Sequence, residues 1–399
     1  MDTVLFRIGL SQMENNKLAI FYSGYLPGEK YGGPVTSLYN LTELIGNDVS
    51  LYIICLDHDL KEKKRYSNIS DGWNRIGKAR VKYLSDKDFN ESHFSEIIDE
   101  ISPNLLYVSS IFSASHVLPA LSLSRKKRIP VLLAPRGELN TNALRKKSLK
   151  KWIYLTLLKV GNKLKETHFQ ATSNEELKNI VESLHVKQSR VFLLPNIPTA
   201  YVPKKNISKN ENEIKLCFVG RIVKNKNLHI ALKAVTGCKN RVCFDIYGPI
   251  EDTIYWDECR ALMDSVGDNI IITYKGALKP AEMRETYSQY DCLISPTEFE
   301  NYGQSIVEAM LHDVPVIVSK GTTPWDEIAD AKAGFVVPID QINEFSLAID
   351  SIAGMNCEKY GELVNNLRIY CSLKFDFESL KRQYLEVISK IIDKGDILL

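Results

Sequence analysis

The feature that most constrains the fold is the alternation of short apolar, β-branched runs with helical patterns along the whole chain. This rhythm is typical of βαβ units in a parallel sheet. The strands predicted in the first half are residues 17–23, 48–56, 79–84, 104–110, 129–134, 166–173 and 189–195. Those predicted in the second half are residues 214–220, 240–248, 269–276, 290–296 and 314–319. The sequence therefore predicts an α/β protein with two Rossmann-like domains.

The two halves are separated by a stretch that loses periodicity and gains Pro, Asn and Lys, as a linker does. A length of 399 residues also favours two domains over one. The predicted order is an N-terminal domain (1–198), a linker (199–213), a C-terminal domain (214–374) and a final amphipathic helix (375–399).

Composition excludes several classes of protein. No apolar run approaches the roughly 20 residues that span a bilayer, and residues 1–16 lack the apolar core of a secretory signal. We therefore expect a cytoplasmic protein. The eight cysteines show neither a C-x-x-C pair nor zinc-like spacing, which indicates reduced thiols. The triplet Asp57–Asp59 matches the D-x-D of metal-dependent transferases by letter, but so short a match is common by chance, and no metal or cofactor is expected.

Basic residues gather in the first half, in the run 125–128 and in residues 144–165, which contain eight basic residues and no acidic one. One interpretation is a solvated helix face. The other is a surface that rests on anionic lipid headgroups, because Trp152 and its apolar neighbours lie beside the charge. Nothing resembles a motif that reads nucleic acid.

Ligands of parallel α/β sheets bind beyond the carboxyl ends of the strands, so the residues there are the candidates for function. Gly32 and Gly33 follow the first strand and precede Pro34. Glycines let the backbone approach a ligand closely, and a helix start behind them is electropositive. A plain tight turn is the alternative. The G-x-G-x-x-G spacing of nicotinamide sites is absent.

Cations follow the strand at 214–220. Arg221 follows the strand directly, and Lys224 and Lys226 stand at the expected beginning of a helix, where the helix dipole disfavours positive charge. A bound phosphate explains this placement, since a guanidinium grips phosphate oxygens and an ammonium adds a point charge. Solvated surface lysines are the alternative. Gly248 and Gly276 end the next two strands and either turn the chain or flank a nucleobase.

Carboxylates lie at both ends of a helix entry in residues 295–319. Ser305 and Glu308 have the spacing of a capping box. The alternative is that Glu300 and Glu308 accept hydrogen bonds from ligand hydroxyls, since carboxylates are acceptor-only groups. A pyrophosphate would then bind the first amides of the helix, which lack intrahelical partners. Those amides follow Gly303 and belong to Gln304, Ser305 and Ile306.

Taken together, FVGRIVKNK, the E-x7-E of EFENYGQSIVE and the downstream HDVPVIVS resemble the retaining glycosyltransferases of family 4. The segments APRGEL and TTPWDEIADAKAGFVV look like members that build bacterial surface polysaccharides. The resemblance implies a GT-B fold, in which two Rossmann-like domains face a central cleft. It also implies transfer from a nucleotide sugar to a saccharide or lipid-linked saccharide with retention of configuration, without a bound metal.

Carried over by position, the resemblance makes Glu300, Arg221 and Lys226 catalytic. Arg221 and Lys226 would neutralise the donor diphosphate, Glu300 would orient the donor sugar and Glu308 would hold the ribose. The expected donor-binding residues are Gly32, Gly33, Arg221, Lys226, Gly248, Gly276, Gly303, Gln304, Ser305, Ile306 and Glu308.

The resemblance is incomplete in two places. Asn301 and Tyr302 replace a common Pro and Phe, which leaves the donor sugar open. Many members have a histidine where this chain has Ser109 and Ser110, so His116 and, more strongly, Arg136 are the candidates for acceptor contact.

Three alternatives remain open from the sequence. A nucleotide-sugar epimerase of the same fold would place carboxylates at the sugar ring, and a non-catalytic partner subunit would commonly lose donor-site groups. All four of Arg221, Lys226, Glu300 and Glu308 are present, which favours transfer. A pyridoxal-phosphate phosphorylase would need a longer chain. In GT-B proteins the last helix often packs on the N-terminal domain, and we expect residues 375–399 to do so.

Overall fold

A computed structural model of the chain describes residues 16–396 apart from 141–143, 145–147, 162, 200–206, 265 and 279–281. Two compact units emerge from the contacts. Unit 1 contains Met1–Ile197 and Phe377–Leu399, and unit 2 contains Pro198–Asp376. Residues 199–213, expected as a linker, are thus counted with unit 2, and 200–206 lie outside the described residues.

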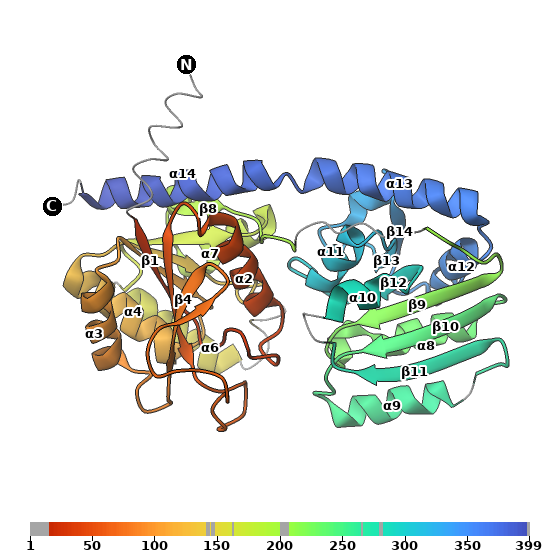
Figure 1. Cartoon of the computed structure of the whole chain (residues 1–399), viewed down its shortest axis with the longest axis horizontal. Coiled ribbons are helices and arrows are strands. Elements are labelled where there is room, and N and C mark those ends of the chain that lie inside the picture. Colours follow the sequence, from red (N-terminus) through yellow and green to blue (C-terminus); the bar gives the residue numbers. More distant parts are fainter. Residues whose placement is uncertain are drawn as a thin grey trace, which may run out of the picture. The chain divides into compact units, whose positions relative to one another are not determined.

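Unit 1 is built on an eight-stranded sheet in the order β3-β4-β2-β1-β5-β6-β7-β8, in which β3 pairs antiparallel with β4 and the other pairs are parallel (Figure 1). Its strands are β1 (Lys17–Phe21), β2 (Ser50–Leu56), β3 (Asn74–Ile76), β4 (Ala79–Leu84), β5 (Leu105–Ser109), β6 (Val131–Ala134), β7 (Thr167–Ala171) and β8 (Val191–Leu193). Its helices are α2 (Gly33–Ile45), α3 (Glu91–Ile101), α4 (Ala114–Lys127), α6 (Ser148–Val160), α7 (Asn174–Leu184), a 3-10 turn (Gln188–Arg190) and α14 (Phe377–Asp396).

The sheet of unit 1 buries both faces, because successive side chains of a strand point to opposite sides. In β1, Ala19 and Phe21 join a core with α3, α4 and α7. Leu18 and Ile20 join a second core on the other face, with α2 and α14. Strands covered on both sides read as continuous apolar runs, which is why the sequence pattern locates them.

The C-terminal helix α14 belongs to unit 1 and contacts α2 and β5. Its apolar face buries Tyr384, Leu385 and Ile388 in the same core as β1 and β2. The Tyr384 hydroxyl donates to the Pro195 carbonyl oxygen at 2.7 Å and accepts from Gln170 Nε2 at 2.8 Å. The helix is therefore held by hydrogen bonds as well as by apolar packing.

Unit 2 contains a six-stranded, all-parallel sheet in the order β11-β10-β9-β12-β13-β14. Its strands are β9 (Glu213–Val219), β10 (Arg241–Tyr247), β11 (Ile270–Gly276), β12 (Cys292–Ser295), β13 (Val316–Ser319) and β14 (Gly334–Val337). Its helices are α8 (Leu228–Thr236), α9 (Thr253–Met263), α10 (Met283–Tyr287), α11 (Gln304–Leu311), α12 (Ile342–Ala353) and α13 (Cys357–Lys374), with 3-10 turns at Lys224–Lys226 and Asp326–Ile328.

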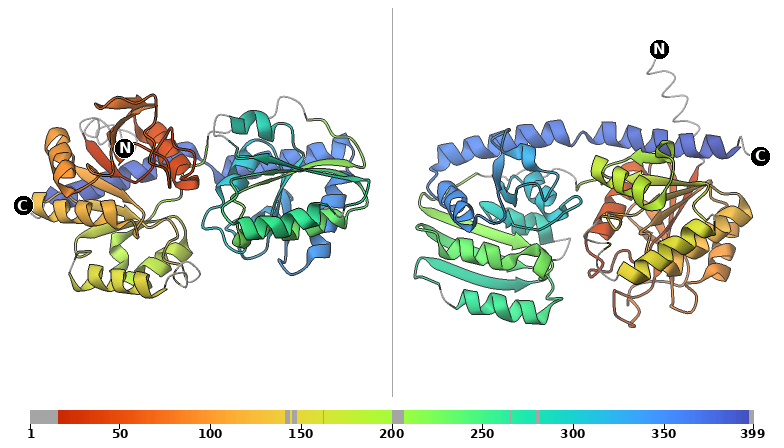
Figure 2. Two further views of the ribbon diagram at one scale, coloured as in Figure 1. Left: turned by 90° about the horizontal axis from the view of Figure 1, so that it is seen from below. Right: turned by 180° about the vertical axis from the view of Figure 1, so that it is seen from behind.

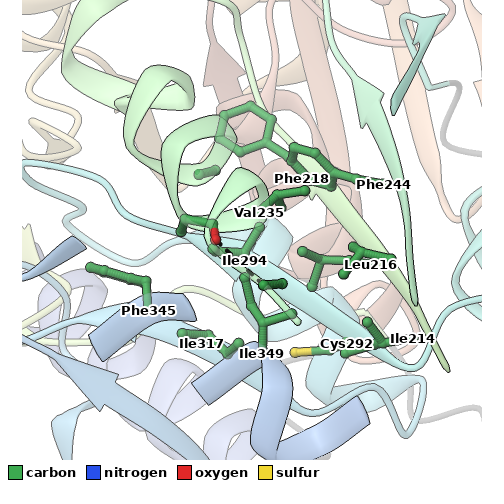
Figure 3. Close-up of a cluster of buried hydrophobic side chains, with 14 of the residues drawn as sticks. Ile214, Leu216, Phe218, Val235, Phe244, Cys292, Ile294, Ile317, Phe345 and Ile349 are labelled. Carbon is green, nitrogen blue, oxygen red and sulfur yellow. Dashed lines mark hydrogen bonds between the residues drawn. The ribbon is translucent and has the colours of Figure 1, made fainter. Parts of the chain in front are cut away.

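Helices cover both faces of this second sheet (Figure 2). Its main core joins the sheet to α8 and α12, where Leu216 and Phe218 of β9 pack with Val235, Phe345 and Ile349 (Figure 3). All twelve strands predicted from the sequence are present. β3 and β14 were not predicted; β3 is polar and lacks the apolar run that marks the other strands.

No helix among the described residues is long and apolar enough to cross a membrane. All eight cysteines are free.

Candidate ligand-binding site

The strand order of unit 2 creates a natural place for a ligand. β9 is the first strand of the sheet and has β10 on one side and β12 on the other. The loops that follow β9 and β12 therefore leave the same sheet edge in opposite directions, and ligands of doubly wound sheets bind at such a switch point. The cationic candidates and Glu300 lie in these two loops, and Glu308 lies in the helix that follows the second of them.

The loop after β9 carries the lysines in a 3-10 turn, Lys224–Lys226, rather than at the first turn of α8. Asn227 follows in the left-handed conformation at φ +53°, and α8 begins at Leu228. The expectation that the lysines occupy a helix start is thus wrong by one turn. Asn227 donates its side-chain amide to the Pro296 carbonyl oxygen at 3.0 Å and so ties the turn to the loop after β12.

Two more hydrogen bonds join the two loops. The Asn225 carbonyl oxygen accepts from the Glu298 amide at 3.0 Å and from the Thr297 hydroxyl at 3.2 Å. The Glu300 amide in turn donates to the Thr322 carbonyl oxygen at 2.8 Å, which anchors the loop to the segment after β13. These hydrogen bonds tie the loop that carries Lys226 to the loop that carries Glu300, and the latter to the segment after β13.

Lys226 and Glu300 meet in an ion pair, with side chains 16% and 19% exposed. Arg221 pairs with Glu251 at 3.0 Å, but its side chain is 52% exposed. The structure thus brings together two of the three residues expected to be catalytic, and it gives each cation a carboxylate partner. The exposed Arg221–Glu251 pair is weak, so an incoming anion can replace Glu251 at modest cost. At the more buried Lys226, the anion has to supply charge in place of Glu300.

The helix α11 begins immediately beyond Glu300. Its N-cap is Gly303, at φ +74°, and no side chain caps it. The capping-box interpretation of Ser305 and Glu308 is therefore wrong, because the cap lies two residues before Ser305. The amide of Ile306 donates to the Gly303 carbonyl oxygen at 2.9 Å, so Ile306 cannot offer that amide to a ligand as expected.

The amides of Gln304 and Ser305 occupy the first two helical positions and precede the first intrahelical bond. They point out of the helix start, where the dipole favours negative charge. Of the three amides that the sequence suggested, these two fit an anion site.

Glu308 lies one turn into α11 and is 2% exposed. Its Oε1 accepts from Gln304 Nε2 at 3.0 Å. Burial raises its pKa to about 7, and the hydrogen bond from Gln304 only partly offsets this effect. Gln304 supplies one donor to this buried carboxylate, whose other lone pairs can accept hydrogen bonds from ligand hydroxyls.

The glycines that end β9, β10 and β11 have different roles. Gly248 has φ +145°, and a Cβ placed on it would come within 1.8 Å of the Gly220 carbonyl oxygen. Backbone packing between neighbouring strand ends therefore requires this glycine. Gly276, at φ +83°, would point a Cβ into open space and leaves room beside the sheet edge.

In unit 1, Gly32 caps α2 at φ +67°, and Gly33 is the first helical residue. A Cβ on Gly32 would meet no atom within 4 Å, so the backbone is open on that side. The preceding loop is held by Asp59, which accepts from the amides of Glu29 at 2.8 Å and Lys30 at 3.1 Å. The last residue of the D-x-D match thus binds backbone, and no group of three potential metal ligands occurs in the described part of the chain.

His116 does not fit the expected contact with an acceptor. Its side chain is fully buried in α4. Nε2 donates to the Ser109 carbonyl oxygen at 2.8 Å, which leaves Nδ1 to accept from the Ser23 hydroxyl at 3.2 Å. Burial lowers the pKa of His116 to about 4, so the ring is neutral. It joins the ends of β1 and β5 and has no nitrogen left for a ligand.

Arg136 has a left-handed backbone at φ +57° and a half-buried side chain. Its guanidinium donates to the Tyr107 hydroxyl at 2.8 Å and to the Asn196 side-chain oxygen. The Tyr107 hydroxyl donates to Gln170 Oε1 at 2.6 Å. Since Gln170 also bonds Tyr384, the guanidinium is linked through two side chains to α14.

Sequence reasoning missed two carboxylates near Arg136 in the sequence or the fold, the half-buried Glu138 and the buried Glu176. Glu138 accepts from the amides of Ile111 at 2.8 Å and Phe112 at 3.2 Å, and from the Ser110 hydroxyl at 2.9 Å. Glu176 accepts from the amides of Gly137 at 2.6 Å and Thr172 at 2.8 Å. A charged residue inside an apolar context, as in APRGEL, was the available signal.

Several known proteins resemble this chain in sequence. Residues 203–369, most of unit 2, match the family described as Glycosyl transferases group 1. An uncharacterized 41.2 kDa protein from the cps region of Klebsiella pneumoniae is 24% identical over 370 residues, covering 89% of this chain and 96% of that protein. The capsular polysaccharide biosynthesis glycosyltransferase CapM of Staphylococcus aureus is 28% identical over 131 residues, covering 32% of this chain and 33% of CapM.

Among solved structures, HepE of Anabaena in complex with UDP and glucose aligns with a TM-score of 0.71 at 14% identity, covering 94% of this chain and all of HepE. Sucrose-phosphate synthase of Thermosynechococcus elongatus aligns with a TM-score of 0.70 at 15% identity, covering 95% of this chain and all of the other. The predicted fold class is confirmed: the chain has the two-domain GT-B fold, with a group 1 glycosyltransferase pattern in unit 2.

Proposed function

We propose that this chain is a glycosyltransferase that takes a sugar from a nucleotide sugar and transfers it with retention of configuration, as the resemblance to family 4 implies. The observation that carries the proposal is the Lys226–Glu300 ion pair at the switch point of unit 2, directly ahead of the open start of α11. This arrangement offers positive charge and free amides to a diphosphate.

The donor diphosphate would displace the carboxylates from Lys226 and Arg221. Negative charge on the diphosphate grows as the bond to the sugar breaks, so these cations stabilise the transition state more than the ground state. The amides of Gln304 and Ser305 add two donors with a fixed direction. Glu300, released from Lys226, is then free to accept hydrogen bonds from the donor sugar.

Glu308 would hold the ribose of the nucleotide. Its carboxyl is buried one turn beyond the two free amides, and it needs more donors than Gln304 supplies. Two vicinal hydroxyls supply them. Gly32 and Gly33 are proposed as further donor-binding residues, as the resemblance implies, and Gly276 would leave room for the base. No metal ion has a role in this scheme.

The acceptor is proposed to be a saccharide or lipid-linked saccharide of a surface polysaccharide. Support comes from the names of the relatives, one from a cps region and one a capsular polysaccharide biosynthesis enzyme. Arg136 is the residue of unit 1 proposed to contact it, because its guanidinium is half-buried at a strand end and held in place by Tyr107.

Thermal-shift measurement of the purified chain against UDP, GDP and their sugars tests the proposal, because a ligand that binds only the folded state raises the melting temperature. At least one nucleotide should stabilise the protein, and its nucleotide sugar should be consumed when a saccharide acceptor is added. No shift with any of them would contradict the donor site. Conversion of the donor without an acceptor would indicate the epimerase instead.

A further inference from the structure

The helix α6 of unit 1 turns an apolar face to solvent. Leu155 and Leu158 pack into the core of unit 1 and fix the orientation of the helix. Surface helices ordinarily place polar residues opposite the buried face. Here the side away from the core is exposed at Leu149 (69%), Trp152 (64%), Ile153 (46%), Leu157 (63%) and Val160 (81%).

These five residues together are called the lipid face. They recur at intervals of three and four and so lie on adjoining turns of one side of α6. A contiguous exposed patch of this kind marks an interaction site more often than isolated apolar residues do.

Positive charge surrounds the lipid face. Lys150, Lys151, Lys159, Lys163 and Lys165 lie in α6 or just after it, and no acidic residue occurs between Glu138 and Glu166. Arg145, Lys146 and Lys147 of the same basic stretch lie outside the described residues.

A second basic run, distant in the sequence, reaches the same place. Arg125 of α4 donates from Nη1 to the Gly161 carbonyl oxygen at 3.4 Å, which puts the run 125–128 beside the end of α6. Lys126 and Lys127 of this run pair with Glu91 at 2.7 Å and Asp99 at 2.6 Å. Arg125 and Arg128 are exposed and add to the charge around α6.

A surface groove continues the apolar area between α4 and α6. Leu118 of α4 and Tyr154, Leu157 and Leu158 of α6 line it, and Lys163 stands at its border. Apolar residues therefore extend from the lipid face toward α4, with a cation beside them.

We propose that the lipid face of α6 inserts into the headgroup region of an anionic bilayer, with the surrounding lysines and arginines on the phosphates. A membrane explains both properties at once, because an interfacial helix needs an apolar face for burial and basic residues for anionic lipid. Trp152 suits the depth of the headgroups. A second copy of the chain would bring two positively charged faces together, which disfavours self-association through α6.

The lipid face would bring the enzyme to a lipid-linked acceptor. Membrane binding itself does not depend on the proposed function; only the identity of the acceptor rests on it. The donor site of unit 2 contributes no residue to the lipid face. The two proposals can therefore fail separately.

Co-sedimentation of the full chain with vesicles of phosphatidylcholine, with and without phosphatidylglycerol, tests the inference. The wild type should bind only the vesicles that contain phosphatidylglycerol, and more weakly as salt rises. The double variant Trp152→Glu/Leu157→Glu should lose at least about tenfold in vesicle partitioning, given the apolar area it withdraws. The matched control is Ile254→Glu/Leu373→Glu, two apolar residues of unit 2 that are 76% and 81% exposed, and it should bind as the wild type does.

The charge contribution is tested by Lys159→Gln/Lys163→Gln, which should weaken binding by about tenfold or more. Lys233→Gln/Lys239→Gln in unit 2 changes the net charge equally and should have little effect. Four results would overturn the inference: no binding by the wild type, equal binding to neutral vesicles, unchanged binding of both α6 variants, or a wild-type dimer that Trp152→Glu/Leu157→Glu makes monomeric in light scattering.

The nucleotide-induced melting shift, measured on the same samples, separates the two proposals. A wild type that responds to nucleotide but ignores vesicles overturns the membrane inference alone. A wild type that binds vesicles but shows no melting shift with any nucleotide overturns the proposed donor site alone. Retention of the nucleotide shift in Trp152→Glu/Leu157→Glu shows that the variant is folded.

Discussion

The strand ends of the two units use charged residues in opposite ways. In unit 2, Lys226 pairs with Glu300 and Arg221 with Glu251, and these pairs are partly exposed to solvent. In unit 1, Glu176 is buried and Glu138 is half-buried, and each accepts several hydrogen bonds from amides and hydroxyls of neighbouring loops. Similar residue types thus stand at similar places in two parallel sheets, in different surroundings.

The difference separates groups that a ligand can recruit from groups that hold loops. A side-chain ion pair near solvent can open, because each partner regains water or a new counterion. A buried carboxylate that satisfies backbone amides cannot leave without exposing unpaired donors. We therefore expect substitutions of Lys226 and Glu300 to change donor binding and turnover, and those of Glu138 and Glu176 to change stability.

The largest effect is expected for Lys226→Ala. It removes the charge proposed to stabilise the departing diphosphate, so turnover of the nucleotide sugar should fall by about 100-fold or more. Lys224→Ala is the matched control, because Lys224 lies in the same 3-10 turn, is exposed and has no ion pair among the described residues. Steady-state kinetics on both variants would contradict the account if their losses were equal.

Glu138→Ala should have the next largest effect, on stability. It leaves the Ser110 hydroxyl and the amides of Ile111 and Phe112 without their acceptor, at a cost of about 2 kcal/mol in the free energy of unfolding. Urea denaturation would measure this loss. The exposed Glu182→Ala in the same unit should change stability by less than about 0.5 kcal/mol. If Glu138→Ala were as stable as the wild type, the loop-holding role would be wrong.

Glu308→Gln should weaken donor binding by roughly tenfold, equivalent to about 1.4 kcal/mol. The amide keeps the size of the side chain but removes the charged acceptor proposed for the ribose, so the variant should be at least as stable as the wild type near pH 7. Binding titrations and urea denaturation check the two parts. Reduced stability with unchanged affinity would show that Glu308 has a structural role alone.

The same variant tests the pKa of Glu308. Because burial raises that pKa from 4.5 to about 7, the folded chain holds a proton that the unfolded chain loses between these values. This carboxyl therefore makes the free energy of unfolding fall as pH rises from about 4.5 to 7. Stability curves of wild type and Glu308→Gln should diverge over that interval, and parallel curves would contradict the raised pKa.

The smallest effect is expected for Tyr384→Phe. It removes the hydroxyl that donates to the Pro195 carbonyl oxygen and accepts from Gln170, at about 1 kcal/mol in the free energy of unfolding. Affinity for nucleotide should not change, since the partners of this hydroxyl, Pro195 and Gln170, are not proposed donor-binding residues. An affinity loss larger than the stability loss would show that α14 acts on the donor site.

The sequence predicted the fold well because buried parallel strands are continuous apolar runs, such as Leu18–Phe21, that stand out from the helices between them. It also predicted that Lys226 and Glu300 both follow strands of the second domain, and the structure pairs them. Side-chain environments were less predictable. His116 and Ile306 were expected at a ligand, but their hydrogen-bonding groups are used within the fold.

The capping interpretation failed for a similar reason. The helix start depends on the left-handed backbone of Gly303, and the spacing of Ser305 and Glu308 carries no information about that conformation. Glu138 and Glu176 were missed because their partners are backbone amides of loops that are remote in sequence or lack a motif. A local sequence pattern reveals strands, whereas tertiary contacts decide which polar groups remain available to a ligand.

The central claim is that unit 2 binds the diphosphate of the donor through Lys226, while Glu138 and Glu176 of unit 1 hold loops. Isothermal titration of the nucleotide that stabilises the protein most, into wild type, Lys226→Ala and Glu138→Ala, tests it directly. The account predicts an affinity loss of about tenfold or more for Lys226→Ala and wild-type affinity for folded Glu138→Ala. Equal affinity in wild type and Lys226→Ala would contradict it.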